Sequence, residues 1–268
     1  MHGLGNDFVL FDFRRDSAPV SDAWIRLVAD RRHGVGCDQV VVLEAPATAD
    51  GPEEAVMRIY NPDGSEAGAC GNAARCVARL LMEESGRDSA TLRTRRGVLT
   101  ALRTAEDQFM VDMGAAQTAW RDVPLARDLE TLRLPITDGP LSAPTAVGMG
   151  NPHCVFFVSD ADRIDLERLG PRLERHPLFP ERTNVEVVSL RPDGALRVRV
   201  WERGAGLTPA CGSGACAALV AAARRGVTAR EARLIMDGGT LEIVWWAEDD
   251  HVLMTGPAAF VFRGEIAL

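Results

Sequence analysis

The chain of 268 residues contains no lysine, so all 30 of its basic residues are arginine. A P-loop needs a lysine beside its phosphates, and Schiff-base aldolases and pyridoxal-phosphate enzymes need a lysine amine that binds a carbonyl carbon. The sequence therefore excludes these three classes. Any carbanion chemistry must proceed without pyridoxal phosphate as an electron sink, and we expect no cofactor.

Long apolar runs and an excess of positive charge are also missing. The uncharged apolar runs are far shorter than the roughly 20 residues that a membrane span needs. The first residues, MHGLGNDFVLFDF, lack the basic start and the cleavage site of a signal peptide. The net charge of −8 argues against nucleic acid as a partner, because phosphate binding needs a basic face. We therefore expect a soluble cytoplasmic protein that binds neither membranes nor nucleic acid.

Cysteine is too sparse for a disulfide scaffold. The six cysteines are Cys37, Cys70, Cys76, Cys154, Cys211 and Cys216. In a reducing cytosol we expect all of them to be free thiols. The spacings 70/76 and 211/216 do not fit a zinc-binding CxxC pair, so no metal site is predicted.

Hydrophobic patterning predicts a strand-rich chain with one prominent helix in each half. Predicted strands cover 7–13, 39–44, 55–60, 90–95, 98–104, 109–113, 146–149, 154–158, 184–190 and 195–201, with further strands after the last helix. Predicted helices cover 21–32, capped by Ser21, then 71–85, ended by Gly86, and 212–225. Residues 115–145 contain four prolines and are predicted to cross between two domains.

The two halves resemble each other. GLGNDFVLF at 3–11 matches GMGNPHCVF at 148–156, and ACGNAA at 69–74 matches ACGSGA at 210–215. The interval from asparagine to cysteine is 64 residues in the first half and 60 in the second. Two motifs in the same order at nearly equal separation indicate duplication of a whole domain.

Each ACGxxA motif places a thiol at the start of a helix. The backbone N–H groups of a first helical turn have no internal partners and form the positive end of the helix dipole. We therefore expect the pKa of Cys70 and of Cys211 to fall from about 8.5 towards neutrality, and the small residues that follow to let a carboxylate approach. The alternative is that both are ordinary small core residues.

Two thiols on opposite sides of a carbon atom can act as the acid and the base that invert a stereocentre. If the halves face each other, one thiol can remove a proton from a carbon and the other can deliver one to its far face. The helix N–H groups would then stabilise the enolate-like charge on a substrate carboxylate. The residues alone thus predict a cofactor-independent racemase or epimerase of a small α-carboxylate compound.

The segments MHGLGNDF, YNPDGSEAGACGNAARC, GNPHC, TNVEV and WERGAGLTPACGSGACAA resemble, in order, the signature segments of the diaminopimelate epimerase family. The resemblance covers the whole chain. It implies an α+β fold of two pseudo-symmetric domains, each a mostly antiparallel sheet wrapped around a central helix, with a site in the cleft between them. The implied domains are 1–113, joined by 258–268, and 114–257. The implied reaction interconverts LL- and meso-2,6-diaminopimelate in lysine biosynthesis. The sequence leaves the oligomeric state open, and we expect a homodimer.

The resemblance also assigns roles to single positions. Cys70 and Cys211 match the family's acid/base thiols, and His153 and Glu202 match residues that tune those thiols. The positions that match substrate-binding residues are Asn6, Gln39, Asn61, Gly71, Asn72, Asn151, Asn184, Glu202, Arg203, Gly212 and Ser213. A permanent Arg203 cation suits a substrate carboxylate, whereas Glu202 and the asparagine amides can accept from an ammonium. Ala73 departs from the glycine that the family usually has there.

Two other functions remain open. One is a proline or hydroxyproline racemase of the same architecture, which Glu202 and Arg203 disfavour because they suit a second polar substrate end. The other is a non-catalytic thiol protein that senses redox state or binds a small molecule. Cys76 and Cys216 are predicted to lie in the core, and Cys154 to point away from His153 on its strand. Of the pair Trp245–Trp246, one side chain is predicted to be partly exposed, a possible dimer contact.

Overall fold

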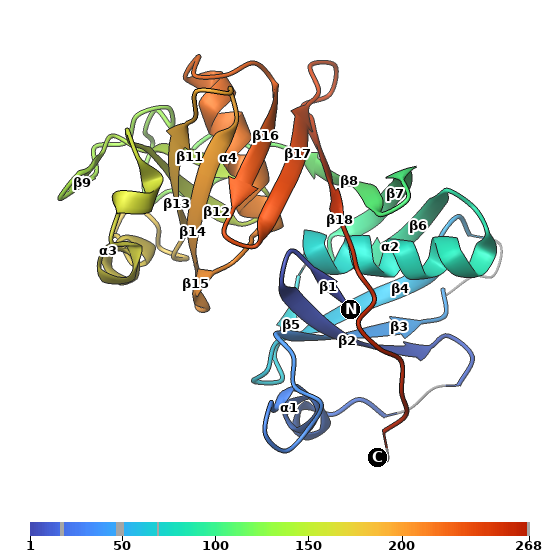
Figure 1. The fold of residues 1–268 in the computed structure, drawn as a ribbon. Helices are drawn as coiled ribbons and strands as arrows, with labels where there is room; N and C mark the ends of the chain where they lie inside the picture. Colours follow the sequence, from blue (N-terminus) through green and yellow to red (C-terminus); the bar gives the residue numbers. More distant parts are fainter. Residues whose placement is uncertain (17–18, 47–50, 69, 267–268) are drawn as a thin grey trace. The chain divides into compact units, whose positions relative to one another are not determined.

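The structure is a computed structural model, and it describes residues 1–16, 19–46, 51–68 and 70–266. The chain forms two compact units (Figure 1). Unit 1 consists of Met1–Val111 and Gly256–Leu268, and unit 2 of Asp112–Thr255. The domain limits predicted from the sequence lie two residues from these bounds. That each unit is a domain able to fold alone stays a prediction.

Unit 1 is a curved sheet with one helix against each face (Figure 1). Its strands follow the order β1 (His2–Gly3), β2 (Asn6–Phe13), β3 (Gln39–Glu44), β4 (Ala55–Tyr60), β6 (Ser89–Thr94), β7 (Gly97–Ala105) and β8 (Gln108–Ala115), with β5 (Glu66–Ala67) on β4. Its helices are α1 (Asp22–Ala29) and α2 (Gly71–Ser85). Helix α2 is the predicted helix 71–85, and Gly86 ends it in the left-handed conformation, as predicted.

Unit 2 repeats this arrangement with an added helix and hairpin. Its strands follow the order β11 (Thr145–Gly148), β12 (Pro152–Phe157), β13 (Asn184–Leu190), β14 (Leu196–Glu202), β16 (Glu231–Met236), β17 (Gly239–Trp245) and β18 (His251–Pro257), with β15 (Gly206–Thr208) on β14. The helices are η1 (Ala161–Arg163), α3 (Leu166–Glu174) and α4 (Gly212–Arg224). Strands β9 (Thr137–Asp138) and β10 (Leu141–Ser142) form a separate hairpin.

The two units share strand order and direction, and the pairs β2–β3 and β3–β4 share their register with β12–β13 and β13–β14. Strand β2 runs parallel to β3, as β12 does to β13, and the following pairs β3–β4 and β13–β14 are antiparallel in both units. Phe8 lies opposite Gln39 in unit 1, and His153 lies opposite Asn184 in unit 2. This correspondence agrees with the duplication that the sequence predicts. The fold is α+β with two pseudo-symmetric halves.

Helices α2 and α4 are the buried centres of their units. In unit 1 the opposite face of the sheet packs against α1, where Ile25 and Val28 meet Val40 and Val42. In α4 the residues from Ala215 to Ala222 are all fully buried, because a helix of alanines and small apolar residues can approach a sheet on several sides.

Two expectations from the sequence are wrong, and one helix was not predicted. Helix α1 ends at Ala29 rather than at 32, because the Asp30 carboxylate accepts from the N–H groups of Arg32 and His33 and turns the chain. Helix α3 was not predicted, since its LERLGPRLE sequence contains Gly170 and Pro171. Residues 115–145 do not simply cross between domains, because they supply buried residues such as Leu134 and Leu141 to the core of unit 2.

Candidate active site

Cys70 is the N-cap residue of α2 in unit 1, and its side chain is partly buried. Its Sγ donates to Oδ1 of Asn6 over 3.8 Å. The same oxygen accepts from Nδ2 of Asn72, the second residue of α2, at 3.2 Å. Three residues that the sequence singles out therefore meet at the start of this helix.

Asn6 is held in place by a carboxylate that sequence reasoning missed. Its Nδ2 donates to Oδ2 of Asp38 at 3.0 Å. Arg31 donates to both Asp7 and Asp38, and Asp7 accepts from the Asp38 backbone N–H. Because Asp38 can only accept, the Asn6 carbonyl oxygen is left to face Cys70.

Gln39 and Asn61 form a second pair in unit 1. Nε2 of Gln39 donates to Oδ1 of Asn61 at 2.9 Å, and Nδ2 of Asn61 donates to the Ser65 hydroxyl at 3.0 Å. Both residues lie at strand ends, where β3 begins and β4 has just ended. A turn follows at 61–64, since the Gly64 N–H donates to the Asn61 carbonyl.

Cys211 is the N-cap residue of α4 in unit 2. Its Sγ accepts from the Gly214 N–H at 3.4 Å and lies 3.6 Å from the Ser213 hydroxyl. The residue is 5 % exposed. Burial raises the pKa of the Cys211 thiol well above its usual range, the Glu202 and Glu186 carboxylates raise it further, and the bonds from Ser213 and Gly214 only partly oppose this rise.

The prediction that the pKa of Cys211 falls is therefore wrong. The helix N-terminus stabilises a thiolate, but removal from water and two nearby carboxylates act in the opposite sense and are larger. For Cys70 the expected fall stays a prediction.

His153 lies on β12 and is fully buried. Its Nδ1 lies 2.6 Å from Oε1 of Glu186 on β13, and its Nε2 lies 3.1 Å from Oδ1 of Asn151. Asn151 in turn donates from Nδ2 to the Ser213 hydroxyl at 3.5 Å. This chain links the start of β12 to the first turn of α4.

Asn184 and Arg203 extend the same cluster. Oδ1 of Asn184 accepts from the Arg203 backbone N–H at 2.7 Å, and Nδ2 of Asn184 lies 3.5 Å from Nδ1 of His153. The exposed Arg203 side chain donates to the Glu181 carbonyl at 2.8 Å. Glu202 accepts from the Thr208 hydroxyl across the β14–β15 pair.

The predicted residues thus form two groups, one in each unit. Unit 1 brings together Asn6, Cys70, Gly71 and Asn72, with Gln39 and Asn61 as a separate pair. Unit 2 brings together Asn151, His153, Asn184, Glu202, Arg203, Cys211, Gly212 and Ser213. Sequence reasoning missed Asp38 and Glu186. An acidic residue within the otherwise apolar run VEVV at 185–188 was the available signal for Glu186.

The other four cysteines are buried in the cores of their units. Burial raises the pKa of the Cys37 thiol to about 11 and that of Cys76 to about 12. Cys154 packs in the core of unit 2 on the face of β12 opposite His153, as predicted. All six cysteines lie within the described residues, and none of them forms a disulfide bond. Among the described residues, no three His, Cys, Asp or Glu side chains are grouped as metal ligands.

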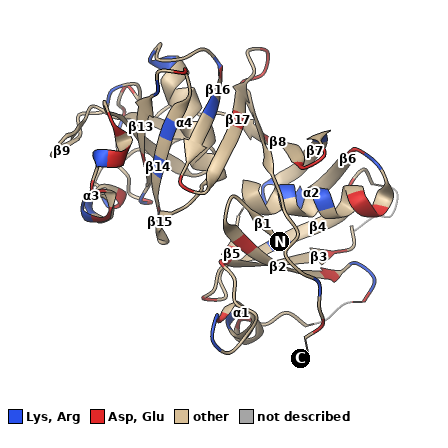
Figure 2. Cartoon of the chain, in the orientation of Figure 1, with Lys and Arg blue, Asp and Glu red and all other residues tan. Residues whose placement is uncertain are grey.

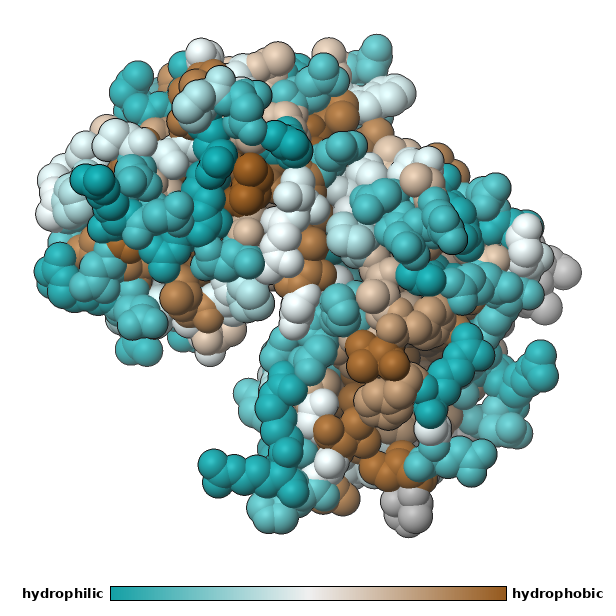
Figure 3. Space-filling model, in the orientation of Figure 1, coloured by the Kyte–Doolittle hydropathy of each residue, from teal (hydrophilic) through white to brown (hydrophobic). Residues whose placement is uncertain are grey.

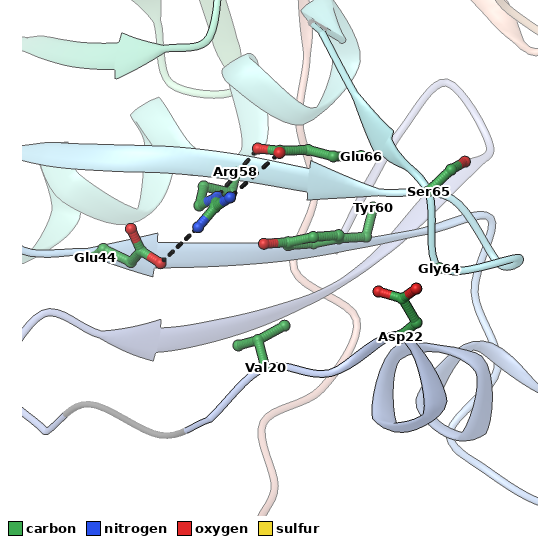
Figure 4. Close-up of a pocket in the computed structure, with 8 residues that line it drawn as sticks. All are labelled: Val20, Asp22, Glu44, Arg58, Tyr60, Gly64, Ser65 and Glu66. Carbon is green, nitrogen blue, oxygen red and sulfur yellow. Dashed lines mark hydrogen bonds and ion pairs between the residues drawn. The ribbon is translucent and has the colours of Figure 1, made fainter.

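A cavity of about 510 Å³ in unit 1 lies outside this set of residues (Figure 4). Its lining residues are Val20, Asp22, Glu44, Arg58, Tyr60, Gly64, Ser65 and Glu66. Arg58 already pairs with Glu66 at 3.0 Å and Glu44 at 3.5 Å, so its charge is compensated. None of the candidate site residues lines this cavity.

Charged residues of both signs are interspersed along the elements of each unit (Figure 2). Most arginines pair with nearby carboxylates, as Arg79 does with Glu83 and Asp107. Among the described residues, none of the helices is long and apolar enough to cross a membrane.

Solved structures with this fold include racemases and epimerases. A probable proline racemase from Agrobacterium radiobacter K84, with bound carbonate, superposes with a TM-score of 0.68 at 18 % identity over 100 % of this chain and 91 % of that chain. A hydroxyproline epimerase from Agrobacterium vitis, with bound trans-4-OH-L-proline, superposes with a TM-score of 0.67 at 17 % identity. The superposition covers 98 % of this chain and 89 % of that chain. The two α+β units of this chain have the fold of these proteins.

Sequence comparison is more specific. A sequence model described as diaminopimelate epimerase matches residues 1–119 and 145–261. Diaminopimelate epimerase of Rhodospirillum centenum is 55 % identical over 267 residues, which cover 100 % of this chain and 91 % of that protein. The same enzyme of Acidiphilium cryptum is 51 % identical over 266 residues, 99 % of this chain and 94 % of that protein. The chain belongs to the diaminopimelate epimerase family.

Proposed function

We propose that this protein is a cofactor-independent epimerase that interconverts LL- and meso-2,6-diaminopimelate, with Cys70 and Cys211 as its two acid/base groups. The observation that carries the proposal is the position of the two thiols. Each cysteine is the N-cap of the buried central helix of its unit, at corresponding points of two units with the same strand order. Membership of the diaminopimelate epimerase family supports the choice of substrate.

The reaction needs one thiolate and one thiol at the start. The thiolate removes the α-proton of the substrate, and the thiol donates its proton to the opposite face of the same carbon. After one turnover the two sulfurs have exchanged protonation states. The mechanism therefore requires both sulfur atoms to reach one α-carbon.

The first turns of α2 and α4, which begin at Gly71 and Gly212, would stabilise the charge that develops on the α-carboxylate, because their N–H groups lie at the positive ends of helix dipoles. The side chains proposed to bind the substrate are Asn6, Gln39, Asn61, Asn72, Asn151, Asn184, Glu202, Arg203 and Ser213. Arg203 would bind the distal carboxylate, and Glu202 the distal ammonium. His153 and Glu202 would tune the thiols.

Proton exchange with the solvent tests the reaction directly. Purified protein incubated with LL-diaminopimelate in D₂O should produce the meso isomer and incorporate deuterium at the α-carbon. L-proline and trans-4-hydroxy-L-proline serve as control substrates, and neither should exchange. Exchange with the control substrates alone would instead favour a proline or hydroxyproline racemase.

Thiol variants distinguish the enzyme from a non-catalytic thiol protein. Cys70→Ser and Cys211→Ser should each lower kcat by about a thousandfold or more, since either direction of the reaction uses both sulfurs. Cys76→Ser and Cys216→Ser are matched controls that should affect stability but not chemistry, because both thiols lie in the core. Full activity of either Cys70→Ser or Cys211→Ser would contradict the two-thiol mechanism.

We also propose a cytoplasmic homodimer. Six cysteines without a disulfide bond suit a reducing compartment. Val261 and Phe262 are 61 % and 67 % exposed, and Trp246 is 48 % exposed. Figure 3 shows hydrophobic residues gathered on unit 1 where the C-terminal segment runs. Sedimentation analysis should give twice the chain mass for the native protein and a monomer for Phe262→Ser, whereas a native monomer would contradict the proposal.

A further inference from the structure

Glu186 and His153 form a fully buried pair of titratable groups in unit 2. Oε1 of Glu186 lies 2.6 Å from Nδ1 of His153, and both side chains are 0 % exposed. Oε2 of Glu186 is also buried and has no hydrogen-bond partner among the described residues. A buried acidic group with one unsatisfied oxygen destabilises a core, so its presence here needs a physical reason.

The corresponding positions of unit 1 show which residues the fold itself needs where unit 2 has His153 and Glu186. Because His153 lies opposite Asn184 as Phe8 lies opposite Gln39, Phe8 is the unit 1 counterpart of His153. Phe8 is buried and apolar.

The same comparison extends to the neighbouring positions. Glu186, two residues beyond Asn184, corresponds to Val41, two residues beyond Gln39. Gly214, three residues beyond Cys211, corresponds to Ala73, three residues beyond Cys70. Both Val41 and Ala73 are fully buried.

Unit 1 therefore fills with Phe, Val and Ala the space that unit 2 fills with His, Glu and Gly. Replacing a buried ionisable pair by hydrophobic residues is often neutral or stabilising. Packing alone does not require the pair, and its occurrence in one unit only points to a chemical role.

Gly214 places the carboxyl group of Glu186 beside the Cys211 thiol. A Cβ atom at position 214 would lie 2.9 Å from Oε1 of Glu186 and 3.4 Å from Sγ of Cys211. The glycine thus allows the carboxyl group to pack directly against the first turn of α4. Alanine at this position would collide with it, whereas unit 1 has the buried Ala73 at the corresponding place.

The hydrogen-bond partners determine where the protons lie. Asn151 presents Oδ1, which can only accept, to Nε2 of His153, so Nε2 carries a proton. The contact between Nδ1 and Glu186 then holds one further proton, on the nitrogen or on the oxygen. Burial raises the pKa of Glu186, and the 2.6 Å contact places this proton between the two groups.

We propose that Glu186 is a positioning residue, which shares one proton with His153 and thereby fixes the ring and the Nε2–H tautomer of His153 beside the start of α4. This inference rests on the proposed function only for its effect on turnover. The state of His153 itself can be measured without any activity.

The first test is spectroscopic. Long-range ¹H–¹⁵N correlation spectra of protein labelled at histidine should show His153 with a protonated Nε2 and a hydrogen-bonded Nδ1, with His153→Phe identifying its signals. In Glu186→Val the Nδ1 signal should move towards that of a nitrogen without a strong partner. An unprotonated Nε2 in the native protein, or identical His153 signals in the two proteins, would overturn the proposal.

The second test is kinetic. Glu186→Val should lower kcat by roughly 10- to 100-fold with KM within about twofold of the native value, and Glu186→Gln, which can still donate to Nδ1, should lose less. The matched control is Glu174→Gln, another buried carboxyl group in unit 2, which accepts from Trp201 and Arg182. It should leave kcat and the His153 signals unchanged.

Stability separates a positioning role from a structural one. Because unit 1 packs phenylalanine and valine at the corresponding places, the double variant His153→Phe/Glu186→Val, which replaces the whole pair, should melt no lower than the native protein while it loses turnover. A lower melting temperature of this double variant would show that the pair is structural and would overturn the proposal. If the native protein has no epimerase activity but His153 responds to Glu186→Val as described, the proposed function fails and the assignment of the pair stands.

Discussion

The side-chain amide of Asn6 donates to Oδ2 of Asp38 at 3.0 Å, and its carbonyl oxygen lies 3.8 Å from Sγ of Cys70. An amide side chain can present either end to its neighbours, so the residue behind it decides which end faces the thiol. Asp38 offers only acceptors and thereby directs the acceptor end of Asn6 to Cys70.

Asp38→Asn should remove this control of orientation. The new amide can donate to Asn6 as well as accept from it, so both orientations of Asn6 become accessible. We expect kcat for interconversion of the diaminopimelate isomers to fall by about 2- to 13-fold, since one positioning hydrogen bond is worth about 0.5–1.5 kcal/mol. Asp88→Asn, an exposed carboxylate that pairs with Arg103, is the control. Equal kinetics for both variants would contradict this role of Asp38.

Alkylation should distinguish the two cap thiols. Cys211 is 5 % exposed and its pKa is raised by burial, whereas Cys70 is partly accessible. Iodoacetamide at pH 8 should modify Cys70 first, and the rate at Cys211 should keep rising above pH 9, because only the thiolate reacts. Peptide mass spectrometry measures both rates, and protein unfolded in guanidinium is the control in which all six cysteines should react alike. Faster modification of Cys211 than of Cys70 in the native protein would contradict the prediction.

Gly170→Ala should destabilise unit 2. A Cβ atom at position 170 would lie 2.4 Å from the Trp201 ring, which is fixed by its hydrogen bond to Glu174. Alanine in a helix is ordinarily about 1 kcal/mol better than glycine, but overpacking should reverse the sign and cost about 1–3 kcal/mol. Urea unfolding measures the difference. Gly68→Ala is the control, since its Cβ would meet only the Arg96 side chain at 3.6 Å; a stabilised Gly170→Ala would show that the ring moves freely.

His251 and Asp112 should make stability depend on pH. Nδ1 of His251 lies 2.8 Å from a carboxylate oxygen of Asp112, and this contact raises the pKa of His251 above 6.5. A raised folded-state pKa contributes stability that is complete below the unfolded value and is lost as the pH rises through the folded value. His251→Gln should therefore lower the free energy of unfolding at pH 6 by at most about 1 kcal/mol, because the pair is partly exposed, and leave it unchanged at pH 9. A larger loss at pH 9 than at pH 6 would show the opposite linkage.

Local sequence signals determined much of the fold. Helix α2 begins after Cys70 and ends at Gly86 as predicted, because a C-cap glycine ends a helix through a contact within its last turn. Strands β3, β4 and β13 have the predicted bounds, since short runs of β-branched residues between turn signals favour one structure strongly. Helix α3 could not be predicted locally. Its Gly170 is explained by the Trp201 ring, a contact between residues far apart in the sequence.

In the candidate site, too, features set by contiguous sequence could be predicted and features set by contacts between distant residues could not. The motifs around Cys70 and Cys211 are contiguous, so the sequence sufficed to place both thiols at helix starts. Asp38 and Glu186 act through partners more than 30 residues away, and sequence periodicity does not reveal such contacts. The direction of the Cys211 pKa shift depended on burial, which is a property of the folded unit.

Unit 1 is assembled from both ends of the chain. The backbones of His2 and Ala259 bond to each other in both directions, and Arg79 donates to the carbonyl of Ala258. On the ribosome, all of unit 2 is therefore synthesised before the segment that completes unit 1. The nascent protein must hold its first 111 residues without their closing segment until translation has passed residue 255.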